Sequence, residues 1–185
     1  MIQDKVLIFP TDTVYGIGTS IYSKEGIARI YKIKNRPLDK PLAVLCANIN
    51  QIEEIAYLTD DAKKLISTFL PGPLTVILKS KESILNSFGH DTVGVRIPKY
   101  KIALDVLKEN GPMATTSVNE SGKPSINDYM IIKKIYNNQV DALYAPDDEP
   151  TSSLASTVVD ITGCEPKVLR VGAISLDMIN ECLNK

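Results

Sequence analysis

The segment Lys34-Asn35-Arg36-Pro37-Leu38-Asp39-Lys40-Pro41-Leu42-Ala43-Val44-Leu45-Cys46 joins the end of a helix pattern to a buried strand. Upstream, Ser23 is placed to cap a helix whose apolar residues recur three and four positions apart. The two prolines hold the connection in non-helical backbone, because proline fixes its own φ and pushes the preceding residue toward extended conformations. The continuous apolar run 42–46 is typical of a strand covered on both faces.

This alternation of helical and β-branched patterns continues along the chain, and it predicts an α/β fold with a mostly covered sheet. Strands are expected at residues 6–9, 42–46, 74–78, 92–97, 113–117, 142–145, 157–161 and 168–171. Further helices are expected from a cap at Asp60 to the stop at 71–73, around residues 103–107 before Gly111, and at 127–136 and 175–183. No composition shift or internal repeat divides the chain, so we expect a single domain over residues 1–185.

Composition counts against several classes of protein. With a net charge of -1, 6% aromatic residues and no tryptophan in 185 residues, the chain lacks the bulk basic charge and stacking residues typical of nucleic-acid-binding proteins. Its three cysteines are odd in number and far apart, which favours a reducing, cytoplasmic setting over a zinc knuckle or disulfide framework. The N-terminal apolar run 6–9 is too short for a signal peptide or a membrane span.

The familiar catalytic motifs are missing as well. His90 is the only histidine, and no nucleophile-elbow pattern accompanies it, so we expect a surface role in a turn. No Walker loop is present, and Gly16-Ile17-Gly18 lacks the third glycine of a dinucleotide fingerprint. The acidic stretch 146–150 is expected to be an exposed, solvated connection rather than a metal site, with a lid as the alternative.

Polar and cationic segments nevertheless lie beside the expected strands, at residues 10–16, 34–41, 92–98, 115–125, 152–157 and 168–172. In one of them Thr92, Gly94 and Arg96 alternate with apolar residues and therefore share one strand face. A guanidinium on a pocket wall can bind a carboxylate through two parallel hydrogen bonds. Each segment alone is typical of a turn or a solvated loop, but together they predict a polar pocket at strand ends.

Taken as an ordered set, these segments resemble the YrdC family, the threonylcarbamoyl-AMP synthases of tRNA modification. The resemblance runs from Pro10 to Gly172 through Pro-Thr-Asp-Thr-Val-Tyr-Gly, Lys-x-Arg-Pro…Lys-Pro-Leu, Pro-Gly-Pro-Leu-Thr, Val-x-Val-Arg-x-Pro, Thr-Ser-x-Asn-x-Ser-Gly, Ser-Thr-Val-Val-Asp and Leu-Arg-x-Gly. It implies a YrdC-like twisted open mixed sheet with flanking helices around a positively charged concave pocket. It also implies a nucleotidyltransferase reaction, in which L-threonine, bicarbonate and ATP give threonylcarbamoyl-AMP and pyrophosphate.

The resemblance also implies roles for individual residues. Two departures from the family pattern are Asn35, where glycine is common, and Leu45, where some members have histidine. The implied catalytic residues are Lys34 and Arg36; the implied threonine site is Thr13, Arg96, Thr115 and Ser156; the implied ATP site is Arg36, Lys40, Thr92, Ser117, Asn119, Ser125 and Arg170.

The implied partners are the three substrates and the downstream proteins that transfer the threonylcarbamoyl group to tRNA. Mg²⁺ is expected to accompany ATP, and no metal is expected to be held by the protein itself. Contact with tRNA itself stays open. No membrane association is expected. Two alternatives stay open at this point. One is a non-catalytic RNA-binding module that uses the same basic cavity, and the other is a maturation enzyme acting on carbamoyl phosphate. The acidic balance counts against the first, and the missing zinc-binding cysteines and extra domains count against the second.

Overall fold

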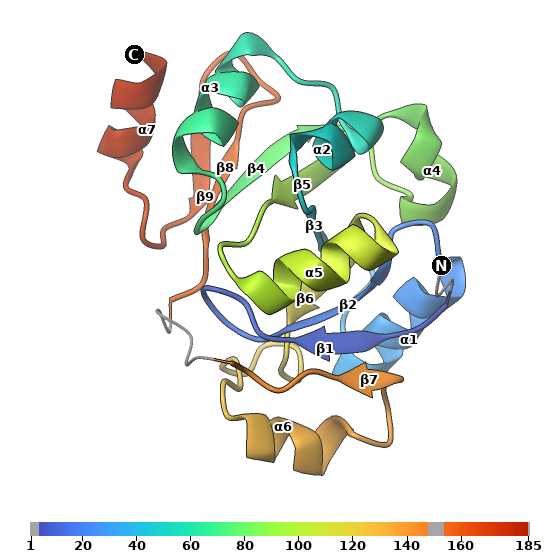
Figure 1. Cartoon of the computed structure of the whole chain (residues 1–185). Coiled ribbons are helices and arrows are strands. Elements are labelled where there is room, and N and C mark those ends of the chain that lie inside the picture. Colours follow the sequence, from blue (N-terminus) through green and yellow to red (C-terminus); the bar gives the residue numbers. More distant parts are fainter. Residues whose placement is uncertain (1–3, 148–153, 185) are drawn as a thin grey trace.

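A mixed β-sheet forms the centre of the protein, shown in Figure 1 by a computed structural model that describes residues 4–147 and 154–184. Within these residues the sheet has nine strands in the order β7-β1-β2-β6-β3-β5-β4-β8-β9. The strands are β1 (Leu7–Phe9), β2 (Gly16–Ser20), β3 (Ala43–Leu45), β4 (Leu74–Lys79), β5 (Thr92–Arg96), β6 (Met113–Ser117), β7 (Ala142–Leu143), β8 (Thr157–Asp160) and β9 (Lys167–Arg170). The pairs β1/β7, β3/β5 and β4/β8 are parallel and the other pairs are antiparallel, which confirms the expected mixed sheet.

The helices are α1 (Lys24–Lys34), α2 (Ile49–Ile55), α3 (Asp60–Phe69), α4 (Glu82–Phe88), α5 (Lys101–Asn110), α6 (Tyr129–Tyr136) and α7 (Leu176–Leu183). Ser23 caps α1 as expected, because its Oγ accepts a hydrogen bond of 2.8 Å from the Gly26 amide. The expected cap at Asp60 is wrong. Thr59 caps α3 by accepting from the Ala62 amide at 3.1 Å, and Asp60 lies in the first turn, where its negative charge suits the helix dipole.

The two faces of the sheet are covered very differently. The larger core lies on one face, where β-strand residues such as Val44 and Val95 pack against α1, α2, α3, α4, α6 and α7. On the other face a smaller core of Leu7, Phe9, Leu45 and Met113 packs against α5, which crosses in front of the sheet in Figure 1. The expectation of a mostly covered sheet therefore holds for one face, and the rest of the second face is left open for a cavity.

The sequence patterns did not predict β2, α2 or α4. β2 begins Gly-Ile-Gly, and glycine weakens a strand pattern because it has no side chain to pack. The structure explains the glycine, since a Cβ atom at Gly18 would lie 2.6 Å from Thr115 Oγ1 on the neighbouring strand β6. Within the described residues, no helix has the length and apolar character needed to cross a membrane.

Candidate functional site

A cavity of about 310 Å³ lies over the open face of the sheet. Residues that pair across strands share a face, and one such row runs from Ile77 through Gly94 and Ala43 to Thr115, all of which line the cavity. The prediction of a pocket at strand ends was therefore incomplete. The cavity extends over the middle of the sheet, because the small residues Gly94 and Ala43 leave that face hollow.

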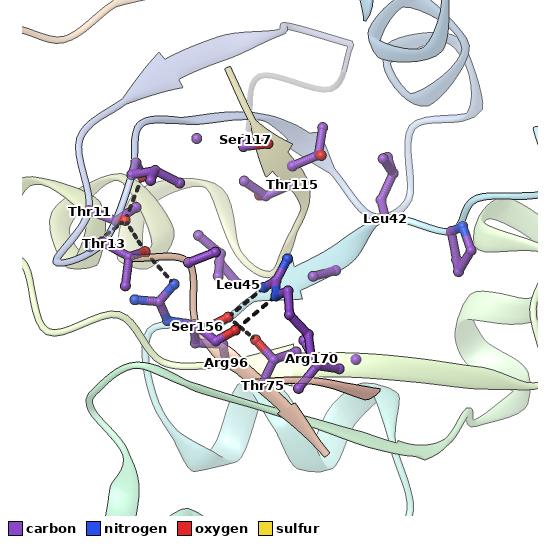
Figure 2. A pocket seen from close by; sticks show the side chains of 18 of the residues that line it. Thr11, Thr13, Leu42, Leu45, Thr75, Arg96, Thr115, Ser117, Ser156 and Arg170 are labelled. Atoms are coloured by element: carbon purple, nitrogen blue, oxygen red, sulfur yellow. Dashed lines mark hydrogen bonds between the residues drawn. The ribbon is translucent and has the colours of Figure 1, made fainter. Parts of the chain in front are cut away.

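One wall of the cavity is organised around Arg96, which is only 6% exposed. Its Nη2 donates to Asp12 Oδ1 at 2.6 Å, its Nη1 to Thr13 Oγ1 at 2.8 Å and its Nε to the Gly72 carbonyl at 3.0 Å. Thr13 Oγ1 lies 3.2 Å from Thr11 Oγ1 in the same network, as Figure 2 shows. Burial lowers the pKa of Arg96 and the Asp12 carboxylate opposes that shift, so the guanidinium stays charged in a fixed plane.

A second hydrogen-bonded group links Thr75, Ser156 and Arg170 (Figure 2). The hydroxyl oxygens of Thr75 and Ser156 are 2.8 Å apart, and both residues are buried. Arg170 donates from Nη2 to Ser156 Oγ at 3.0 Å and from Nε to the Ser156 carbonyl at 2.9 Å. This group therefore joins Ser156, predicted for the threonine site, to Arg170, predicted for the ATP site.

Lys34 supports the cavity without lining it. The side chain is 1% exposed, and its Nζ donates to the Ser117 carbonyl, to the Asn119 carbonyl at 2.8 Å and to Asn119 Oδ1 at 2.7 Å. Ser117 Oγ also donates to Asn119 Oδ1, at 2.8 Å, so Asn119 links Lys34 to a residue that lines the cavity. Burial, reinforced by the positive charge of Arg36, lowers the pKa of Lys34 to about 8. Lys34 thus holds the end of β6 in place through hydrogen bonds, without lining the cavity itself.

Arg36 follows α1 on the non-helical connection that the two prolines predicted, and its side chain lines the cavity. It is held by its own loop, because its Nε donates to the Lys40 carbonyl at 2.9 Å and its Nη2 to the Pro41 carbonyl at 2.8 Å. The Lys40 side chain is exposed and is not among the lining residues of this cavity.

The structure brings most of the predicted site residues together around one cavity. Those that line it are Thr13, Arg36, Thr92, Arg96, Thr115, Ser117, Ser125, Ser156 and Arg170. The prediction gave no role to Thr75, although this residue ends the quoted Pro-Gly-Pro-Leu-Thr motif and is a hydroxyl in the apolar run 74–78. His90 lies just before β5, with its ring 5.3 Å from that of Phe88, away from the cavity-lining set. Part of the acidic stretch 146–150 and of the segment 152–157 lies outside the described residues.

A family model, curated relatives and solved structures all match this chain, and all three come from one family. A protein-family model, Sua5_yciO_yrdC, described as "Telomere recombination", matches residues 1–172. A threonylcarbamoyl-AMP synthase from Pyrococcus abyssi is 33% identical over 99% of this chain and 55% of its own length. One from Bacillus subtilis is 35% identical over 96% of this chain and 52% of its own. This chain therefore spans about half the length of those two relatives, but it covers 83% of a Mycobacterium tuberculosis relative that is 36% identical.

Solved structures agree. The crystal structure of P. abyssi Sua5 complexed with L-threonine matches with a TM-score of 0.90 and 34% identity, over 97% of this chain and 54% of that one. The crystal structure of Escherichia coli YciO matches with a TM-score of 0.82 and 26% identity, over 95% of this chain and 87% of that one.

Proposed function

Because this chain belongs to the Sua5/YciO/YrdC family, we propose that it is a threonylcarbamoyl-AMP synthase. L-Threonine and bicarbonate form a carbamate with loss of water, and the carbamate reacts with ATP to give threonylcarbamoyl-AMP and pyrophosphate. The observation that carries the proposal is the single cavity in which three guanidinium groups, those of Arg36, Arg96 and Arg170, accompany a ring of hydroxyl groups. Each reactant presents at least one anionic group (the threonine carboxylate, bicarbonate and the phosphates of ATP), and guanidinium groups suit these.

The threonine substrate is assigned to the wall built on Arg96. The protein binds one N–H on each of the three guanidinium nitrogens of Arg96, which leaves one N–H on Nη1 and one on Nη2, and we assign the substrate carboxylate to these. Thr13 binds Arg96 directly, and Thr115 and Ser156 are further hydroxyl-bearing residues that line the cavity. Anchoring the carboxylate leaves the amine free to face bicarbonate.

We assign the nucleotide to the other cationic lining residues, Arg36 and Arg170, together with the hydroxyl groups of Thr92, Ser117 and Ser125. Lys34 and Asn119 act by holding the end of β6 that carries Ser117. Lys40 follows Arg36 on the same exposed loop, and we assign its ammonium to the outer phosphates.

The chemistry needs orientation and charge more than it needs a protein nucleophile. A carbamate oxygen must approach the α-phosphorus in line with the departing pyrophosphate, and holding reactants in such alignment lowers a barrier by roughly 7–11 kcal/mol. The Arg36 guanidinium stabilises the negative charge that grows on pyrophosphate. Within the described residues no cluster of carboxylate, histidine and cysteine side chains could hold a metal ion. We assign Mg²⁺ to the ATP substrate, because Mg²⁺ commonly binds through substrate phosphate oxygens and keeps several waters.

The test is pyrophosphate release by the purified protein with ATP, Mg²⁺, threonine and bicarbonate, each omitted in turn. We expect pyrophosphate release only when threonine and bicarbonate are both present. Equal release after either substrate is omitted rules out the proposal. The RNA-binding alternative predicts no turnover and an RNA affinity that falls steeply with salt. The product is labile, so we propose that transfer proteins acting on tRNA consume it.

A further inference from the structure

Thr75 is a buried hydroxyl in the cavity wall that the proposed substrate roles leave unused. It lies in β4, is 5% exposed and lines the cavity beside Ser156. Its Oγ1 is 2.8 Å from Ser156 Oγ, and either atom could be the donor. The consequence of this contact depends on where the two hydroxyl protons go.

Arg170 occupies one acceptor site of Ser156 Oγ, which makes the role of Thr75 as donor or acceptor decisive for what Ser156 can offer a ligand. A guanidinium only donates, so the bond from Arg170 Nη2 uses one of the two lone pairs of Ser156 Oγ. If Thr75 donates as well, the second lone pair is also used, and Ser156 is left with its O–H alone. In that arrangement Ser156 can only donate to a ligand. It therefore selects an acceptor oxygen and rejects an ammonium group. Accepting two bonds also polarises its O–H and strengthens the bond that it donates.

The backbone around this pair is firmly held. The Arg170 Nε bond to the Ser156 carbonyl and the bond from the Thr157 amide to the Pro73 carbonyl, both 2.9 Å, fix Ser156 between β9 and the start of β4. Across the sheet, a Cβ atom at Gly94 would lie only 3.2 Å from the Thr75 Cγ2 methyl, so that methyl packs directly over Gly94. With its methyl placed against β5, Thr75 directs its hydroxyl toward Ser156.

We propose that Thr75 is a positioning residue that donates to Ser156 Oγ and thereby turns the Ser156 proton toward an acceptor oxygen of the amino-acid substrate or its carbamate. The inference rests on the proposed function, because it uses the assignment of Ser156 to the threonine site. Since Arg170 is assigned to the nucleotide, the same contacts connect the two substrate sites.

The experiment compares pyrophosphate release by wild type, Thr75→Val, Thr75→Ser, Ser156→Ala and the double variant Thr75→Val/Ser156→Ala, with threonine varied at saturating ATP and bicarbonate. Thermal unfolding first establishes that each variant is folded, and Thr75→Ala replaces Thr75→Val if the valine does not fit. We expect loss of the Thr75 hydroxyl to raise KM for threonine about tenfold. We expect kcat and KM for ATP to change less than about twofold, since those contacts remain. Thr75→Ser keeps the hydroxyl but loses the methyl that directs it, so its KM for threonine should lie between those of wild type and Thr75→Val.

The double variant tests whether Thr75 acts through Ser156. In that case Thr75→Val adds nothing once Ser156 is alanine, and KM for threonine equals that of Ser156→Ala alone. Independent effects that multiply, or an unchanged KM in Thr75→Val, overturn the inference while the proposed function stands. If pyrophosphate release by the wild-type protein does not depend on threonine, the proposed function itself is overturned. The two outcomes are distinguishable, because the inference is tested on the variants and the proposed function on the wild type. Thr68→Val, on α3 outside the lining set, is the matched control and should behave as wild type.

Discussion

Arg96 and Asp12 form a buried ion pair, with Nη2 2.6 Å from Oδ1 and side chains that are 7% and 8% exposed. Breaking such a pair from one side leaves a buried charge without compensation and costs about 3–5 kcal/mol. The pair also orients the guanidinium that we assign to the threonine carboxylate, so stability and substrate binding depend on the same contact.

Asp12→Asn should therefore lower the free energy of unfolding by about 3 kcal/mol and raise KM for threonine. Urea unfolding with a linear extrapolation measures the first effect and pyrophosphate kinetics the second. The matched control is Asp105→Asn, which removes the exposed Lys101–Asp105 pair with its similar separation of 2.7 Å. Exposed pairs contribute about 1 kcal/mol or less, so the control should leave both quantities nearly unchanged. Equal effects in the two variants would contradict a special role for the buried pair.

Arg36 should matter for turnover far more than for stability. Its side chain donates to two carbonyls of its own loop, interacts with the Tyr31 hydroxyl at the end of α1, and lines the cavity. Arg36→Ala should lower kcat about 10²–10³-fold, the usual cost of removing a group that stabilises transition-state charge. The unfolding midpoint should shift little. Lys32→Ala removes an exposed cation from the same helix end and should change kcat less than about twofold. An Arg36→Ala enzyme of normal kcat would remove Arg36 from the mechanism.

Lys34 makes a prediction about pH. Burial lowers its pKa in the folded protein from 10.5 to about 8, while the unfolded chain keeps the ordinary value. Between these pH values the unfolded state binds more protons than the folded state, so this residue makes stability rise with pH. Comparing wild type with Lys34→Met isolates the effect, because the other titrating groups are common to both. We expect the increase in unfolding free energy between pH 7.5 and 9.5 to be smaller in Lys34→Met, whereas Lys32→Met should match wild type.

Sequence patterns predicted the strands that are rich in β-branched residues, the cap at Ser23 and the polar segments that line the cavity, because each of these is encoded locally. The roles of individual site residues came from the family resemblance. They could not predict which distant segments meet. Arg96 and Asp12 are 84 positions apart and Thr75 and Ser156 are 81 apart, and these contacts depend on the order of strands in the sheet. Thr75 ends the Pro-Gly-Pro-Leu-Thr motif, but the motif alone does not indicate its contact with Ser156, because that contact requires β8 to lie beside β4. For Lys34, the charge alone suggested a contact with phosphate. The sequence did not show that the side chain is buried and donates to the Ser117 and Asn119 carbonyls.

Gly94 provides a test of how tightly the cavity wall is packed. A Cβ atom there would meet Thr75 Cγ2 at 3.2 Å, a contact that forces the neighbour to move. Gly94→Ala therefore has two opposing effects. Reduced freedom of the unfolded chain stabilises by about 0.4–1 kcal/mol, and the crowding costs about 1–3 kcal/mol. We expect net destabilisation in the wild-type background, measured by urea unfolding.

Thr75→Ser removes the Cγ2 methyl and keeps the hydroxyl, so it should relieve the crowding. In that background Gly94→Ala should become neutral or stabilising, because only the unfolded-state effect remains. The sign of the change thus depends on one methyl group in the neighbouring strand. If Gly94→Ala destabilises both backgrounds equally, the crowding does not act through Thr75, and the methyl contact that we take to direct the Thr75 hydroxyl toward Ser156 is not what positions it.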